Sequence, residues 1–257
     1  MPPVDAMGSS QAKTETVDGV PVLWSAPAAP TAILLHVPAF SQTKEQTQPV
    51  LDHALSLGFV AVAIDPYQHG ARGTEDRNAL THRVFANFRR EMWTIIGETA
   101  LDVPRIAAWA RTKFGADLPV HLTGLSMGGD VVVAAAPFVE RVASVNAVVA
   151  TPDWQRPGMR DIASGELVAQ GTPDARPRLF FEYLNPIDHP ERFRALRVHF
   201  IVGELDTHVP PEAAYRFQKI VNGGAEAGPV RITQKAGLTH LDFIGPTWIG
   251  DLDFGLR

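Results

Sequence analysis

Residues 120–130 read VHLTGLSMGGD, and the three glycines crowded around Ser126 are the feature that most restricts how this chain can fold. Glycine inside a regular element costs roughly 0.5–1 kcal/mol relative to alanine, so the cluster indicates a backbone too tight for ordinary side chains. The apolar run before Gly124 predicts a buried strand, and the small apolar residues after Gly129 predict a helix. We therefore expect a very sharp strand-to-helix turn with Ser126 at its apex.

The rest of the chain repeats this alternation of short apolar runs and longer amphipathic segments. Strands are predicted at residues 20–24, 32–36, 59–65, 120–125, 145–151, 198–203 and 230–234. Helices are predicted at 44–58, 90–113, 127–138, 211–221 and near 246–255, with Pro104 expected to kink the second helix or to begin another. Such alternation predicts an α/β fold: a mostly parallel central sheet with helices on both faces, in one domain spanning residues 1–257.

Two segments depart from this rhythm. Residues 1–14 carry no regular pattern and are expected to form a flexible N-terminus. Residues 152–190 contain many prolines and several aromatic side chains but no strand pattern, which predicts a small lid over a pocket; the alternative is a long connecting loop with short helices. Trp154 and Tyr183 from this segment, together with Phe40, are predicted to line an apolar substrate pocket; the alternative is that these aromatics form the core of the lid.

Composition removes several classes of function. The chain has no cysteine, which excludes disulfides, thiolate metal sites and a cysteine nucleophile. Its formal net charge of −5 argues against nucleic acid or an anionic membrane as a partner. The first residues lack a signal-peptide pattern, and no apolar run approaches the roughly 20 residues of a membrane-spanning helix. We expect a soluble, cytoplasmic protein, either a monomer or a homodimer.

The turn at Ser126 has a specific chemical use. A strand, the pentapeptide Gly-Leu-Ser-Met-Gly and a helix match the G-x-S-x-G nucleophile elbow, in which a strained turn exposes the serine hydroxyl. The helix N-terminus beside that hydroxyl favours developing negative charge. The pattern therefore predicts that Ser126 is a catalytic nucleophile; the simpler alternative is a tight structural turn.

A serine needs a base, and in folds with this elbow the order along the chain is serine, acid, histidine. Of the histidines after Ser126, His189 lies in the irregular segment and His199 inside a predicted strand, while His208 remains possible. His240 lies between the last predicted strand and the last predicted helix, a position from which it could reach the serine. We predict that His240 is the base.

The acid should follow a strand between these two residues. The run VHFIVGELDTHVP leads directly from a strand into Asp206, which is the preferred candidate for orienting the imidazole. Glu204 is the nearest alternative, with turn capping as its structural role, and Asp153 is a less favoured one. Asp242 is expected to be a solvent-facing or capping carboxylate.

Together these residues resemble the α/β-hydrolase superfamily, over nearly the whole chain. The stretches LLHVPAFSQTKEQ, IDPYQHGARG, LDVPRIAAW and GELDTHVP are similar to small bacterial carboxylesterases of the YjfP/YtaP type. The His-Gly-Ala-Arg loop and the pair Lys44–Glu45 are what narrow the resemblance to that group. It implies hydrolysis of small carboxylic esters by Ser126, Asp206 and His240, without a cofactor or a metal.

The resemblance fails at one position that matters for the chemistry. Such esterases usually carry His-Gly where this chain has His36-Val37, and the next residue is Pro38. Since proline has no N–H, residue 38 cannot donate a hydrogen bond to the oxyanion of the reaction. We therefore assign the oxyanion hole to the Met127 N–H and to Ala39, with Phe40 as a second choice. His36 and His69 are expected to hold loops in shape.

Three kinds of alternative to ester hydrolysis are considered at this point. The same three side chains could serve an amidase, a thioesterase or a small peptidase, because pocket shape chooses the leaving group. The unusual Val37-Pro38 could instead mark a lyase or another non-hydrolytic enzyme that uses the histidine as a base. A binding protein without catalysis on this fold is disfavoured because all three catalytic residue types are present in order.

Overall fold

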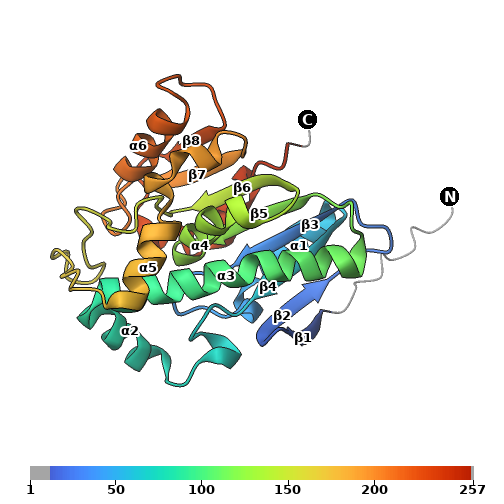
Figure 1. The fold of residues 1–257 in the computed structure, drawn as a ribbon, viewed down its shortest axis with the longest axis horizontal. Helices are drawn as coiled ribbons and strands as arrows, with labels where there is room; N and C mark the ends of the chain where they lie inside the picture. The colour runs from blue at the N-terminus through green and yellow to red at the C-terminus, as the bar shows by residue number, and fades with distance from the viewer. Residues whose placement is uncertain (1–11, 256–257) are drawn as a thin grey trace.

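The computed structural model describes residues 12–255 and contains one eight-stranded sheet (Figure 1). The strand order is β1-β2-β4-β3-β5-β6-β7-β8; β1 and β2 are antiparallel, β2 pairs antiparallel with β4, and the remaining pairs are parallel. This confirms the predicted α/β architecture. The strands are β1 (Lys13–Val17), β2 (Val20–Ser25), β3 (Ala32–Val37), β4 (Phe59–Ile64), β5 (Val120–Leu125), β6 (Val142–Val148), β7 (Val198–Gly203) and β8 (Val230–Lys235).

Alternate side chains of the central strands enter two separate cores, one on each face of the sheet. In β3, Ile33 and Leu35 join the core that contains α3 (Phe88–Phe114) and α4 (Met127–Ala135). Leu34 joins the core on the opposite face, with α1 (Gln48–Ser56). Both faces are thus buried, which explains why these strands read as continuous apolar runs. Figure 1 shows α3 and α4 crossing in front of the sheet, with α6 (Glu212–Val221) beside β7 and β8.

Several elements differ from the sequence prediction. The strand β1 was not predicted, because KTETV is an edge strand with mostly polar side chains. Lys13 and Thr14 belong to it, so the predicted flexible N-terminus is wrong at these two positions; residues 1–11 lie outside the described part of the chain. The helix α3 runs through Pro104 as one helix, and residues 246–255 form a 3₁₀ helix only over Pro246–Asp251.

Two helices that pack against α3 were not predicted. The helix α2 (Arg77–Ala86) is only weakly amphipathic and buries just Leu80 and Val84, which explains why no periodic pattern marked it. The helix α5 (Ala175–Leu184) lies within the irregular segment 152–190 and packs against α3, where the Phe181 and Trp93 rings stack with centroids 4.3 Å apart. The segment is thus anchored to the body of the domain.

Candidate active site

Ser126 occupies the strained turn that its glycines predicted. It lies between β5 and α4 with φ 52° and ψ −118°, a left-handed conformation that is uncommon for a residue with a side chain. A Cβ atom on Gly124 would collide with the backbone of Gly128, and one on Gly128 would collide with the carbonyl oxygen of Val37. The glycines are therefore required by the close approach of strand and helix.

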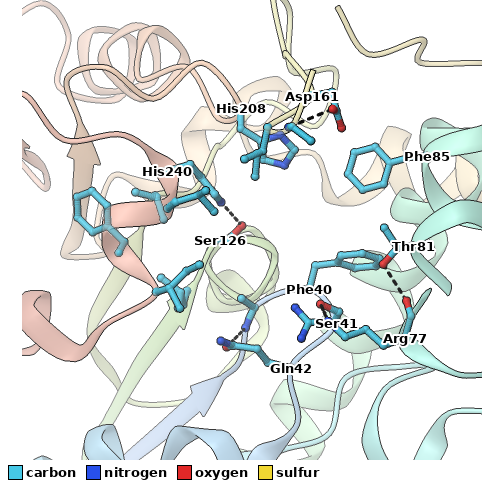
Figure 2. A pocket seen from close by; sticks show the side chains of 18 of the residues that line it. Phe40, Ser41, Gln42, Arg77, Thr81, Phe85, Ser126, Asp161, His208 and His240 are labelled. Atoms are coloured by element: carbon cyan, nitrogen blue, oxygen red, sulfur yellow. Dashed lines mark hydrogen bonds between the residues drawn. The ribbon is translucent and has the colours of Figure 1, made fainter. Parts of the chain in front are cut away.

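The three predicted side chains come together at the carboxyl edge of the sheet, after β5, β7 and β8. Ser126 Oγ lies 3.0 Å from His240 Nε2, and His240 Nδ1 lies 2.7 Å from Asp206 Oδ2. Figure 2 shows His240 directed at Ser126, with a dashed line for this contact. The geometry is that of a nucleophile, a base and an orienting acid in one line.

Asp206 is fixed by its second oxygen. Oδ1 accepts hydrogen bonds from the backbone N–H groups of His208, at 2.9 Å, and of Val209, at 2.8 Å, while Oδ2 faces His240. The carboxylate is buried, with 1% of its side chain exposed. Since it accepts from His240 Nδ1, that nitrogen carries the proton and Nε2 is left to accept one from the serine.

The alternative residues considered in the sequence have partners elsewhere. Glu204 accepts from the backbone N–H of Gly237, Asp242 from Thr239, and Asp153 pairs with Arg216. His189 contacts the carbonyl oxygen of Glu182, and His199 contacts Asn146 and Thr233. His36 of β3 contacts the Thr123 hydroxyl of β5, so it joins two strands rather than holding a loop. His69 contacts the carbonyl of Tyr67 within its own loop, as expected. None of these side chains forms a hydrogen bond with His240, whose ring bonds to Ser126 and Asp206.

A buried ion pair between Lys44 and Asp65 fixes the end of the loop that follows β3. Lys44 Nζ lies 2.7 Å from Asp65 Oδ2, and the Lys44 backbone N–H donates to Asp65 Oδ1 at 3.0 Å. Asp65 Oδ2 also accepts from the N–H of Ala71 at 2.9 Å, which joins the His-Gly-Ala-Arg loop to the same carboxylate. Asp65 thus joins the loop after β3 to the His-Gly-Ala-Arg loop after β4, which gives Lys44 and Asp65 a structural role.

The predicted oxyanion donors differ in their surroundings. Met127 is the first residue of α4, so its N–H has no acceptor within the helix and is available to a group at the helix N-terminus. The Ala39 N–H instead donates to Gln42 Oε1 at 3.2 Å. Ala39 is therefore engaged in this conformation and would serve as a donor only after Gln42 releases it.

A cavity of about 450 Å³ opens beside the serine, and its walls test the predicted substrate-binding residues. Phe40 lines it (Figure 2), but Trp154 and Tyr183 do not. Trp154 is fully buried in the core, where its carbonyl oxygen accepts from Trp93 Nε1, and Tyr183 is 63% exposed on α5. The prediction is therefore wrong for these two residues. From segment 152–190, the cavity is lined by Asp161, Ile162 and Ala163.

Sequence reasoning missed one wall of the cavity altogether. Arg77, Thr81 and Phe85 line it from α2, as Figure 2 shows. Arg83 on the same helix forms ion pairs with Glu75 and with Glu91 of α3, which fix the position of α2. Two features of the sequence mark this helix: Asp76, a favoured N-cap residue that caps α2, and the cluster of arginines and glutamates over residues 72–91.

A second buried ion pair lies beneath the elbow. Asp130, in the first turn of α4, pairs with Arg156 and accepts from the Thr151 N–H at 2.7 Å. Burial raises the pKa of Asp130, and the charge of Arg156 opposes that rise. The pair connects the beginning of segment 152–190 to the helix that carries the serine at its N-terminus.

The Lys44–Asp65 pair leads to a testable expectation. Lys44→Met should lower the free energy of unfolding by about 3–5 kcal/mol, because Asp65 is left as a buried charge without its partner. Urea denaturation measures the loss. Lys235→Met is the matched control, since Lys235 pairs with Asp251 at the partly exposed surface and should cost less than about 1 kcal/mol. Equal losses in the two variants would contradict a structural role for the buried pair.

Within residues 12–255, no helix is both long and apolar enough to cross a membrane. The same part of the chain contains no cluster of three or more histidine, aspartate or glutamate side chains that could hold a metal ion.

Comparison with solved structures identifies the architecture. Neither a protein-family model nor a curated protein matches the sequence. The chain is similar to the Thermus thermophilus protein TT1662, with a TM-score of 0.71, 21% identity and 94% of each chain covered. It is also similar to the Pyrococcus furiosus esterase Pf2001, with a TM-score of 0.67, 17% identity, and 95% of this chain and 90% of that chain covered. A Pyrococcus horikoshii acylaminoacyl peptidase gives 0.65 at 15% identity, with 91% of this chain and 38% of that one covered. The chain thus has the α/β-hydrolase fold.

Proposed function

We propose that this protein is a serine hydrolase that cleaves small carboxylic esters through an acyl-enzyme intermediate. The observation that carries the proposal is the continuous contact from Ser126 Oγ through His240 to Asp206, with distances of 3.0 and 2.7 Å. The fold neighbours include an esterase and a peptidase, which supports hydrolysis as the type of reaction. The adjoining cavity of about 450 Å³ is large enough for a small organic ester.

In the first half-reaction, His240 Nε2 removes the proton from Ser126 Oγ as the oxygen attacks the ester carbonyl. Asp206 stabilises the imidazolium that forms, because its Oδ2 accepts from Nδ1 at 2.7 Å. His240 then gives the proton to the departing alcohol. In the second half-reaction, a water molecule takes the place of the alcohol, loses a proton to His240 and releases the acid.

The negative charge on the carbonyl oxygen needs two donors. We assign one to the Met127 N–H at the start of α4, where the helix dipole adds to the hydrogen bond. The second is an amide of the loop after Pro38: that of Ala39, once Gln42 has released it, or that of Phe40. In this proposal residues 161–163 form part of a cover over the cavity, in keeping with the lid predicted for segment 152–190.

Covalent labelling tests the proposal. A fluorophosphonate should add a single label to the wild-type protein, and peptide mass spectrometry should place it on Ser126. Short p-nitrophenyl esters should be hydrolysed by the unlabelled protein and not by the labelled one. A label on another serine, or turnover that survives stoichiometric labelling of Ser126, would refute the proposed mechanism. A non-hydrolytic enzyme that uses His240 only as a base would accumulate no acyl-enzyme with a slow ester.

A further inference from the structure

His208 is held next to His240 by contacts that leave it little freedom. Its backbone N–H donates to Asp206 Oδ1 at 2.9 Å, so its position is tied to that of the acid. Its ring lies edge-on to His240, with centroids 4.9 Å apart, and faces Phe85 of α2 at 6.1 Å. It lines the same cavity as Ser126, and Figure 2 shows it between His240 and Asp161.

The hydrogen bonds of His208 determine which ring nitrogen carries the proton. Nδ1 lies 2.9 Å from the carbonyl oxygen of Arg160, and a carbonyl oxygen can only accept. Nδ1 is therefore the donor, and in the neutral ring Nε2 carries a lone pair. Burial, with a smaller contribution from His240, lowers the pKa of His208 to about 4, so the ring is neutral at pH 7. Within the described residues 12–255, Nε2 forms no hydrogen bond, and the ring lines the cavity.

If the proposed function holds, the chemistry determines which half of the ester lies against His208. His240 Nε2 must give its proton to the departing oxygen, so the alcohol half of the ester lies against His240. His208 packs on the His240 ring and therefore borders the alcohol half rather than the acyl half. The lone pair of His208 Nε2 at this wall can accept a hydrogen bond from a donor on the alcohol half.

We propose that His208 Nε2 accepts a hydrogen bond from a second hydroxyl group on the alcohol half of the substrate, so that monoesters of diols or polyols are preferred. A hydroxyl fits better than an ammonium group, because a cation here would be repelled by the imidazolium that forms on His240. The positive charge of Arg156, which is close enough to lower the pKa of His208, adds to this repulsion. Of the other wall residues near His208, Phe85 and Ile162 are apolar and Asp161 is anionic. This inference rests on the proposed ester hydrolysis and makes His208 a residue that determines specificity.

Three butyrate esters that share one acyl group test the inference: 2-hydroxyethyl, 2-methoxyethyl and propyl butyrate. A pH-stat measures kcat/KM at pH 7 for each. A neutral hydrogen bond contributes about 0.5–1.5 kcal/mol, so the wild-type protein should favour the hydroxyethyl over the methoxyethyl ester about two- to twelvefold. In His208→Leu this ratio should fall to near one, because the acceptor is gone. His208→Gln, whose amide oxygen can accept, should recover part of the preference.

Phe85→Leu is the control variant, since it alters the same wall but removes no acceptor; it should change kcat/KM for all three esters and preserve their ratio. A wild-type ratio near one overturns the inference, whatever the variants do. A preference that persists in His208→Leu also overturns it, because another group must then hold the hydroxyl. If Ser126 forms the fluorophosphonate adduct and the ratio is one, only the specificity proposal fails. If no adduct forms and no ester is hydrolysed, the proposed function fails and the specificity proposal falls with it.

Discussion

Ser126→Ala should lower kcat/KM for p-nitrophenyl butyrate by about 10⁴–10⁶-fold, the range expected when the nucleophile of a three-residue catalytic group is removed. The variant loses the only atom of this side chain that contacts His240, while its Cβ remains in the same strained turn. Binding of the ester should persist because the cavity walls are unchanged. Initial rates measured over a range of enzyme concentrations would separate residual catalysis from contamination.

Ser41→Ala is the matched control for Ser126→Ala, because Ser41 is a second serine that lines the same cavity. Ser41 also has a positive φ, of 61°, and its hydroxyl accepts from Arg77 Nε rather than from His240. Ser41→Ala should therefore lose less than about tenfold in kcat/KM, because it removes one exposed hydrogen bond from the Arg77 guanidinium and no contact to His240. The melting temperature of Ser126→Ala should match that of the wild type. Loss of activity together with unfolding, or comparable losses in both variants, would contradict the assigned role of Ser126.

The meeting of the three site residues could be predicted from the sequence because it depends on topology. In a parallel sheet, the carboxyl ends of the strands meet at one edge, so residues that directly follow β5, β7 and β8 must lie near one another. Ser126, Asp206 and His240 each follow a strand that was predicted from the sequence. Predicting that these three residues lie close together therefore did not require knowing how the loops pack.

The cavity walls could not be predicted because they depend on tertiary packing. Trp154 directly follows the turn after β6 and looked like a pocket residue, but its large ring fills the core beside Trp93. Tyr183 lies on the exposed side of α5, and that helix had no detectable pattern. The hydrogen bond between Ala39 and Gln42 is another contact that no spacing rule predicts, since a loop after proline has several possible turns.

Asp206→Asn should also lower kcat/KM, by about 10⁴-fold, although the side chain keeps its size. The reason lies in the second oxygen of Asp206, which accepts from the N–H groups of His208 and Val209. An asparagine must keep its carbonyl oxygen there, so its NH₂ group faces His240 Nδ1. Nδ1 then has to accept, the proton of the ring moves to Nε2, and Nε2 can no longer take the proton of Ser126.

The same substitution at another buried aspartate shows whether the loss comes from this change of tautomer. Asp153, the less favoured acid of the sequence analysis, pairs with Arg216 and does not contact His240, so Asp153→Asn should cost less than about tenfold in kcat/KM. NMR of the ring protons should find the His240 proton on Nδ1 in the wild type and on Nε2 in Asp206→Asn, with little change in melting temperature. A variant that keeps wild-type activity with the proton on Nε2 would mean that His240 is not the base, because a protonated Nε2 cannot remove the proton from the serine.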